Sequence, residues 1–204
     1  MKEVENFITT EESNYLIRMI DRFAHKSMVV GSGEKMNILS NQRTSSTSNL
    51  IADDPTVQTL HNKIARYLGL SIKKGESLQG QRYEKGQFFN SHVDYFKGHT
   101  YDMNCLASGN RTYTFMLYLN DNFEGGHTKF KHLNKEIIPK ACKGVVWNNL
   151  QHGYTNEYME HSGEEVTSGK KYIITSWWRE NIWNGGEDQK EYEKKLKSNQ
   201  LSII

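Results

Sequence analysis

From Leu70 onward the chain breaks into short β-rich runs, and this texture constrains the fold more than any other feature of the sequence. Gly, Asn and Asp fall between the runs, as is typical of the turns that join neighbouring strands. Many short strands separated by turn signals indicate a β-sandwich or a β-barrel. The runs lie at about residues 78–84, 88–93, 112–119, 127–130, 136–138, 144–148 and 171–179.

Two helices are predicted ahead of this strand-rich region. A capping box that begins at Thr9 starts the first helix, which the apolar spacing places over residues 10–27. Asp54 caps the second helix, Pro55 occupies its first position and Gly69 ends it. Helices followed by many strands predict a mostly β fold, with the helices packed on one side of an antiparallel core.

Three other stretches carry weaker signals. Residues 31–49 are rich in Gly, Ser, Thr and Asn and are predicted as a loop with a short strand near residues 43–46. Residues 98–110 hold no recognisable motif and are candidates for a lid or a substrate loop. The charged residues 187–197 are predicted as a solvated helix.

Length and composition favour one intracellular domain with one core. The 204 residues divide into helical support at about 1–70, a β core at about 71–180 and a charged tail at 185–204. A net charge of +2 argues against a dedicated nucleic-acid binder. Two cysteines make no disulfide framework. Neither a signal peptide nor a membrane span is recognisable, which predicts a cytoplasmic protein; the oligomeric state is left open.

His92 and Asp94 are the first candidates for metal ligands. In an extended chain, side chains two residues apart point to the same face, so an imidazole and a carboxylate can hold one ion from one side. One more His would complete the two-His-one-carboxylate arrangement of non-haem Fe(II) oxygenases. A single His-x-Asp occurs easily by chance in a chain with 8 His. The candidates for the third ligand are His127, His132, His152 and His161.

Among these four, His161 is favoured because Lys171 follows it at the start of an apolar strand. A lysine on an otherwise apolar strand face is costly to bury unless an anion pairs with it. The alternative is a lysine outside the barrel with its ammonium group in water. His152 remains the rival third ligand.

Seven short motifs follow one another from about Arg43 to Arg179, and their order and spacing are more specific than any one of them. They resemble the prolyl 4-hydroxylase-like branch of the Fe(II)- and 2-oxoglutarate-dependent dioxygenases. The motifs are Arg43-Thr-Ser45, Glu76-x-Leu-Gln79, Arg82-Tyr-Glu-x-Gly-Gln87, His92-x-Asp94, Arg111-Thr-x-Thr, Gly125-Gly-x-Thr-x-Phe130 and the stretch from His161-x-Gly163 through Lys171 to Trp177.

The resemblance implies a fold and a metal site. The fold would be a double-stranded β-helix, also called a jelly roll, flanked by the N-terminal helices. His92, Asp94 and His161 would ligate Fe(II). Three protein ligands on one face of an octahedron leave two positions for a 2-oxo acid and one for O2.

The resemblance also implies roles for residues around the metal. Lys171 would pair with the distal carboxylate of 2-oxoglutarate, helped by the hydroxyl of Thr128. Tyr83 would hydrogen-bond the co-substrate near the metal. The peptide groove of the family is lined at positions that match Arg43, Ser45, Glu76 and Arg111.

Three positions depart from the family pattern. Phe89 stands where substrate-binding members often carry Tyr, which removes a hydroxyl from the substrate side. His127 replaces a common acid, and Tyr172 replaces the Trp that usually follows the lysine. The change at Phe89 affects the expected substrate contacts and leaves the expected chemistry in place, whereas His127 adds a competing histidine near the site and Tyr172 is a mild change on the other face of its strand.

The implied function is hydroxylation of an unactivated C–H bond, with a peptidyl proline as the leading substrate. Fe(II), 2-oxoglutarate and O2 would take part, succinate and CO2 would be the co-products, and ascorbate would support turnover. A peptide or protein is therefore the expected partner. Two alternatives stay open: the same chemistry on a lysyl residue, a free amino acid or a nucleobase, and a jelly-roll binding module without turnover.

Overall fold

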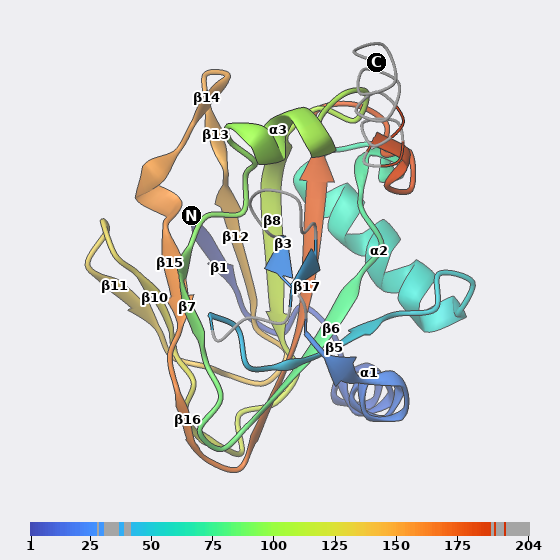
Figure 1. The fold of residues 1–204 in the computed structure, drawn as a ribbon. Helices are drawn as coiled ribbons and strands as arrows, with labels where there is room; N and C mark the ends of the chain where they lie inside the picture. The colour runs from blue at the N-terminus through green and yellow to red at the C-terminus, as the bar shows by residue number, and fades with distance from the viewer. Residues whose placement is uncertain (28, 31–36, 39–41, 189, 191–193, 195–204) are drawn as a thin grey trace.

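Two antiparallel sheets face each other, and two helices cover the outer face of the larger sheet (Figure 1). The structure is a computed structural model that describes residues 1–27, 29–30, 37–38, 42–188, 190 and 194. The larger sheet contains seven strands, in the order β1 (Lys2–Val4), β12 (Gly144–Asn148), β8 (Arg111–Tyr118), β17 (Lys170–Arg179), β6 (Gln79–Glu84), β5 (Ser46–Asn49) and β2 (His25–Lys26).

The smaller sheet contains four strands, in the order β11 (Lys135–Ile137), β10 (Thr128–Phe130), β15 (His161–Gly163) and β7 (Phe89–His92). The described residues also form two-stranded pairs outside these two sheets. These are β13 (Leu150–Gln151) with β14 (Tyr154–Thr155), β9 (Glu124–Gly125) with β16 (Val166–Ser168), and β3 (Val29–Val30) with β4 (Asn37–Ile38). The arrangement is the jelly roll that the family resemblance implies, with the helices on one side as the sequence pattern predicts.

The two predicted helices are present as α1 (Thr10–Phe23) and α2 (Pro55–Leu68). Thr9 forms the predicted capping box, and the Asp54 side chain accepts hydrogen bonds from the first turn of α2. The first helix ends at Phe23 and not at residue 27, because Ala24 is extended and the next two residues pair as β2. None of the helices in the described part of the chain combines the length and apolar character needed to cross a bilayer.

The large sheet is buried on both faces, because successive side chains along each strand alternate between two clusters. On β17, Ile174 and Trp178 face the helices, whereas Ile173 faces the smaller sheet. The same alternation on β8 sends Phe115 toward the helices and Met116 toward the smaller sheet. The space between the sheets is therefore reached by every second residue of the central strands.

The remaining stretches differ from the sequence prediction in detail. Residues 98–110 contain a short helix, α3 (His99–Asn104), which lies at one end of the barrel (Figure 1). Residues 31–36 and 39–41 lie outside the described residues, as does most of the predicted helix at 187–197. Two short 3-10 helices, η1 (Ile72–Lys74) and η2 (Glu157–Met159), complete the set of described helices. The short strands β1, β2, β9 and β13 to β16 lie outside the runs that the sequence prediction marked as strands.

Gly80 of β6 packs directly against Ile20 of α1. A Cβ at this position would lie 2.4 Å from Ile20 Cγ1, so Gly80→Ala must displace the Ile20 side chain or the helix that carries it. We expect Gly80→Ala to lower the free energy of unfolding by about 1–3 kcal/mol in urea denaturation. Ile20→Ala removes the obstructing atoms and by itself should cost about 2–5 kcal/mol. The double variant should lose less unfolding free energy than the sum of the two single losses. A loss equal to that sum would contradict this account of the contact.

Candidate active site

The pairing of β7 with β15 brings the predicted metal ligands together. His92 ends β7, His161 begins β15, and the two residues are direct cross-strand partners. The carboxylate of Asp94 lies 3.7 Å from His92 Nε2 and 4.0 Å from His161 Nε2. One potential ligand atom from each residue lies within 4.8 Å of the others, and no other group of this kind occurs among the described residues.

Both imidazoles present Nε2 to the space between the ligands. His92 Nδ1 lies 2.8 Å from the carbonyl oxygen of Asn90, and His161 Nδ1 lies 2.9 Å from that of Met159. Because a carbonyl oxygen can only accept, each Nδ1 carries the ring proton and each neutral ring keeps its lone pair on Nε2. Burial and repulsion from His161 lower the pKa of His92 to about 3, which favours the neutral form that binds metals.

Asp94 is held at both its side chain and its backbone. Thr114 Oγ1 donates to Asp94 Oδ2 at 2.6 Å, and Asn149 Nδ2 donates to Thr114 Oγ1 at 2.8 Å. Arg111 Nη1 donates to the Asp94 carbonyl oxygen at 3.3 Å. Burial would raise the pKa of this carboxyl, but the nearby histidines and Arg111 outweigh burial and hold the pKa below its usual value. The carboxylate is therefore ionised and oriented.

This donor set fits a divalent transition metal. Two imidazole nitrogens from the paired strands β7 and β15 and one carboxylate from just after β7 converge, which is the ligand chemistry of non-haem Fe(II) sites. Aromatic rings fix the two imidazoles in place. Phe89 stacks on His92 with 3.7 Å between ring centroids, and Trp147 packs edge-on against His161 at 4.7 Å.

Lys171 lies inside the barrel and not in solvent. Its side chain is 1% exposed, and its Nζ donates to the carbonyl oxygen of Gly126 at 2.6 Å. The ammonium group also lies 5.1 Å from the ring centroid of Tyr83 and 5.5 Å from that of Tyr118. Among the described residues, no carboxylate comes within ion-pair distance of it, and burial lowers its pKa to about 7. The alternative of a solvated lysine is therefore wrong.

A pocket between the two sheets connects Lys171 with the three-residue cluster. Tyr83 and Thr128, the other predicted co-substrate contacts, both line it. The Tyr83 hydroxyl donates to Gln81 Oε1 at 3.2 Å, and Thr128 Oγ1 lies 2.6 Å from the hydroxyl of Tyr118. Most walls of the pocket are apolar or aromatic, so polar groups converge at only a few points. The lining also includes Phe89, His92, Asp94, Met116, Trp147, His161, Ile173, Thr175 and Trp177.

The four residues predicted to line a peptide groove form two buried clusters beside this pocket. Arg43 Nε donates to Ser45 Oγ at 3.0 Å, and the Arg43 guanidinium lies 5.0 Å from the ring centroid of Phe89. Arg111 donates from Nε and Nη2 to the two carboxylate oxygens of Glu76, at 2.7 and 2.8 Å. Each cluster therefore contacts a residue of the pocket or the backbone of a predicted ligand.

The competing histidines lie apart from the cluster. His152 is exposed in the turn of the β13–β14 hairpin, with a φ of 52°. His127 and His132 each contact a glutamate side chain, at 3.0 and 2.9 Å. Of the four candidates for the third position, the structure places His161 beside the His-x-Asp pair.

Comparison with known proteins places this site in a family. The sequence model described as the 2OG-Fe(II) oxygenase superfamily matches residues 78–179, which is half of the chain. Prolyl 4-hydroxylase 1 of Arabidopsis thaliana is 30% identical over 194 residues, covering 87% of this chain and 68% of the relative. The chain belongs to the 2OG-Fe(II) oxygenase superfamily. As a member it is an Fe(II)- and 2-oxoglutarate-dependent dioxygenase, and its cofactor set is Fe(II), 2-oxoglutarate and O2.

Further relatives within the superfamily carry similar names and folds. Prolyl 4-hydroxylase 2 of A. thaliana is 29% identical over 85% of this chain and 64% of its own length, so the chain spans about two thirds of these relatives. The viral collagen prolyl hydroxylase of Paramecium bursaria Chlorella virus-1, solved with 2-oxoglutarate, has a TM-score of 0.68 at 23% identity, over 87% of this chain and 94% of that one. A prolyl hydroxylase of Trichoplax adhaerens, solved with a peptide fragment of hypoxia inducible factor, has a TM-score of 0.66 at 14% identity, over 92% of this chain and 84% of that one. These solved structures confirm the jelly-roll fold.

Several residues of the site escaped the sequence prediction. Thr114 orients Asp94, and it belongs to a motif that was recognised without a role for this side chain. Asn149 belongs to none of the recognised motifs, and Gly126 belongs to one that gave no role to its backbone carbonyl. Tyr118, whose hydroxyl contacts Thr128, lies on the same face of β8 as Thr114, so strand alternation could have placed it beside the pocket.

Lys171→Met removes the buried charge and keeps an unbranched side chain. Folding lowers the pKa of this lysine from 10.5 to about 7, so the folded protein holds the proton less tightly than the unfolded chain. This disfavours folding by at most about 5 kcal/mol below pH 7, and the penalty disappears as the pH rises to 10.5. We expect the ligand-free variant to be more stable than wild type at about pH 6 and to lose this advantage toward about pH 10 in urea denaturation.

Lys170→Met is the matched control, because Lys170 is the exposed neighbour on the same strand. It should leave the free energy of unfolding nearly unchanged at both pH values. A Lys171→Met variant no more stable than this control at low pH would contradict the assignment of a buried charge.

Proposed function

We propose that this dioxygenase hydroxylates a prolyl residue of a peptide or protein. The observation that carries the proposal is the buried Lys171, which has no carboxylate within ion-pair distance in the described part of the chain and lies in the same pocket as a cluster of two histidines and one aspartate. One end of the pocket has the donor set for a divalent metal and the other end has a cation for a carboxylate. A metal-chelating dicarboxylic acid such as 2-oxoglutarate satisfies both ends.

His92, His161 and Asp94 are proposed as the three metal ligands. Each histidine offers Nε2, because its Nδ1 is engaged by a backbone carbonyl. Asp94 offers Oδ1, since Oδ2 accepts the hydrogen bond from Thr114. When bound, Fe(II) and 2-oxoglutarate supply the oxidative decarboxylation to succinate and CO2 that drives C–H hydroxylation.

Lys171, Thr128 and Tyr83 are proposed to bind the co-substrate. The Lys171 ammonium would pair with the distal carboxylate, and a charge-assisted hydrogen bond of this kind is worth about 1.5–3 kcal/mol. The hydroxyls of Thr128 and Tyr83 line the same pocket and can donate to the bound acid. Burial of all three side chains excludes water from the co-substrate.

The prolyl substrate is inferred from the relatives. Prolyl 4-hydroxylases of A. thaliana are similar in sequence, and one neighbour in fold is a prolyl hydroxylase solved with a peptide fragment. Arg43, Ser45, Glu76 and Arg111 are proposed to border the peptide groove, and ascorbate remains a predicted supporting reductant. We also propose that residues 1–204 form one dioxygenase domain, with the β core at about 71–180.

The metal ligands can be tested by anaerobic titration with Fe(II) in the presence of 2-oxoglutarate. Wild type and His152→Ala should develop the weak visible charge-transfer band of a bound 2-oxo acid. His161→Ala should lose it, because two remaining ligands cannot hold the chelate firmly. Loss of the band with His152→Ala instead would contradict the ligand assignment, and its absence from folded wild type would favour a binding module without turnover.

The substrate can be tested with synthetic peptides under turnover conditions. We expect a proline-rich peptide to gain the mass of one oxygen atom, with one succinate formed for each hydroxylation. The same peptide with alanine for proline should gain none, and Asp94→Asn should abolish both products. Coupled succinate release with lysyl peptides, free amino acids or nucleobases, but not with proline peptides, would move the assignment to one of those alternatives.

A further inference from the structure

Glu76 holds two arginines side by side at the end of the large sheet. Arg179 of β17 pairs with Arg111 of β8 next to a bulge, so two guanidinium groups meet across the strands. Like charges in this position destabilise a sheet unless an anion lies between them. Glu76 Oε1 accepts from Arg111 Nε at 2.7 Å and from Arg179 Nε at 2.5 Å. Burial would raise the pKa of Glu76, but the two guanidiniums lower it, so the carboxylate stays ionised.

The first arm of this cluster reaches a predicted metal ligand. Arg111 uses Nε and Nη2 on Glu76, which leaves Nη1 to donate to the carbonyl oxygen of Asp94. The guanidinium is fixed in its plane by two aromatic rings, with centroids 3.9 Å away at Trp177 and 4.8 Å away at Phe96. The position of the Asp94 backbone therefore depends on how firmly Glu76 holds Arg111.

The second arm reaches the loop of residues 96–110. Arg179 is 6% exposed, and its Nη1 donates to the carbonyl oxygens of Asn104 and Gly109, at 3.0 and 2.8 Å. These contacts join the end of α3 and the returning strand of the loop to one guanidinium. Through these two hydrogen bonds, Arg179 Nη1 links the loop to β17 of the large sheet.

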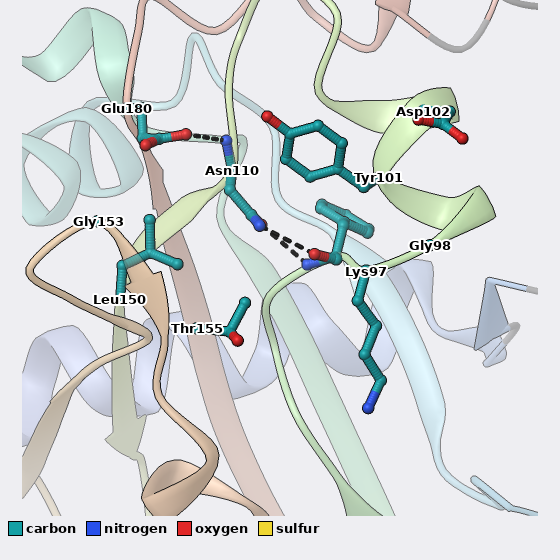
Figure 2. A pocket seen from close by; sticks show the side chains of 10 residues that line it. Lys97, Gly98, Tyr101, Asp102, Asn110, Leu150, Gly153, Thr155 and Glu180 are labelled. Atoms are coloured by element: carbon teal, nitrogen blue, oxygen red, sulfur yellow. Dashed lines mark hydrogen bonds between the residues drawn. The ribbon is translucent and has the colours of Figure 1, made fainter.

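Asn110 closes the base of the same loop. Its side chain accepts from the Phe96 N–H at 2.8 Å and donates to the Phe96 carbonyl oxygen at 2.9 Å. The backbone N–H of Asn110 donates to Glu180 Oε2 at 2.6 Å, and Figure 2 shows these bonds meeting at Asn110 beside Tyr101 of α3. Phe96 and Asn110, the two ends of the loop, are therefore bonded to each other, and Asp94 lies two residues before Phe96.

We infer that Glu76 is a positioning residue that couples the metal ligand Asp94 to the order of the 96–110 loop. The inference rests on the proposed function for the identity of Asp94 as a ligand. Glu76 binds both Arg111 and Arg179, so a displacement of one guanidinium shifts the carboxylate and, through it, the other guanidinium. Its carboxylate already accepts three guanidinium N–H bonds and the residue is 8% exposed, which leaves little of it for a substrate.

Glu76→Gln tests the centre of this unit, because it keeps the shape and removes the charge between two guanidiniums. We expect the Kd for Mn(II), measured by electron paramagnetic resonance with 2-oxoglutarate present, to rise roughly 10- to 100-fold. Backbone amides of the 96–110 loop should exchange with deuterium faster in the metal-free variant. If Glu76→Gln raises only the KM for a peptide and leaves the metal Kd and loop exchange as in wild type, the inference is overturned.

Glu3→Gln is the matched control. Glu3 also bridges two cations, Lys135 at 2.8 Å and Lys143 at 3.2 Å, but it lies on β1 at the far edge of the sheet. It should change neither the metal Kd nor exchange in the loop. An equal effect of both glutamate variants would show a general loss of stability and would overturn the positioning role.

Arg179→Met tests the transmission, because Arg179 touches the loop and Glu76 but none of the three proposed ligands. We expect it to raise the Mn(II) Kd about tenfold in wild type and to have little further effect in Glu76→Gln. A Kd that stays within about twofold of wild type while loop exchange speeds up would overturn the coupling.

Wild type provides the reciprocal measurement if these variants do not fold. Coupling works in both directions, so Mn(II) with 2-oxoglutarate should slow amide exchange in the 96–110 loop. Bound metal with unchanged loop exchange overturns the inference and leaves the proposed function intact. Failure of wild type to bind Mn(II) overturns the proposed function, and the inference falls with it.

Discussion

The antiparallel pairing of β7 with β15 is the contact on which the site depends. It sets His92 and His161 directly opposite each other, with 4.3 Å between ring centroids, although they lie far apart in the chain. Side chains alternate along a strand, so a slip of one residue would turn His161 to the other face. The strand β15 has only three residues, and it is held in register because β10 pairs with its other edge.

Local rules were enough for the elements that strong patterns define. The caps at Thr9 and Asp54 and the alternating runs of β6, β8, β12 and β17 place these elements close to where they are found. The early end of α1 was not predictable, because residues 24–26 leave the helix to pair with β5, and that pairing is a tertiary contact. Strands of two or three residues are likewise defined by their partners and not by their own composition.

The candidate site also combines residues that local patterns predict with residues that only the tertiary structure places. A His-x-Asp pair follows from strand alternation, whereas the third histidine was preferred over His152 only through its distance in sequence from Lys171. Alternation shows that Lys171 shares a face with Ile173, but it does not say which face points into the barrel. The helices decide that, because Ile174 and Trp178 pack against them and leave the other face for the pocket.

The charges around the pocket explain why its two ends belong together. At the ligand end, the guanidiniums of Arg111 and Arg179 are balanced by the carboxylates of Glu76 and Asp94. Lys171 and Arg43 are both buried, and among the described residues neither has a carboxylate within ion-pair distance. Burial lowers the pKa of Lys171 to about 7. A divalent cation and a dicarboxylate dianion together leave the net charge of the pocket as it was, whereas either one alone changes it by two units. Electrostatics therefore favours joint binding, with the dianion bridging the metal and the lysine.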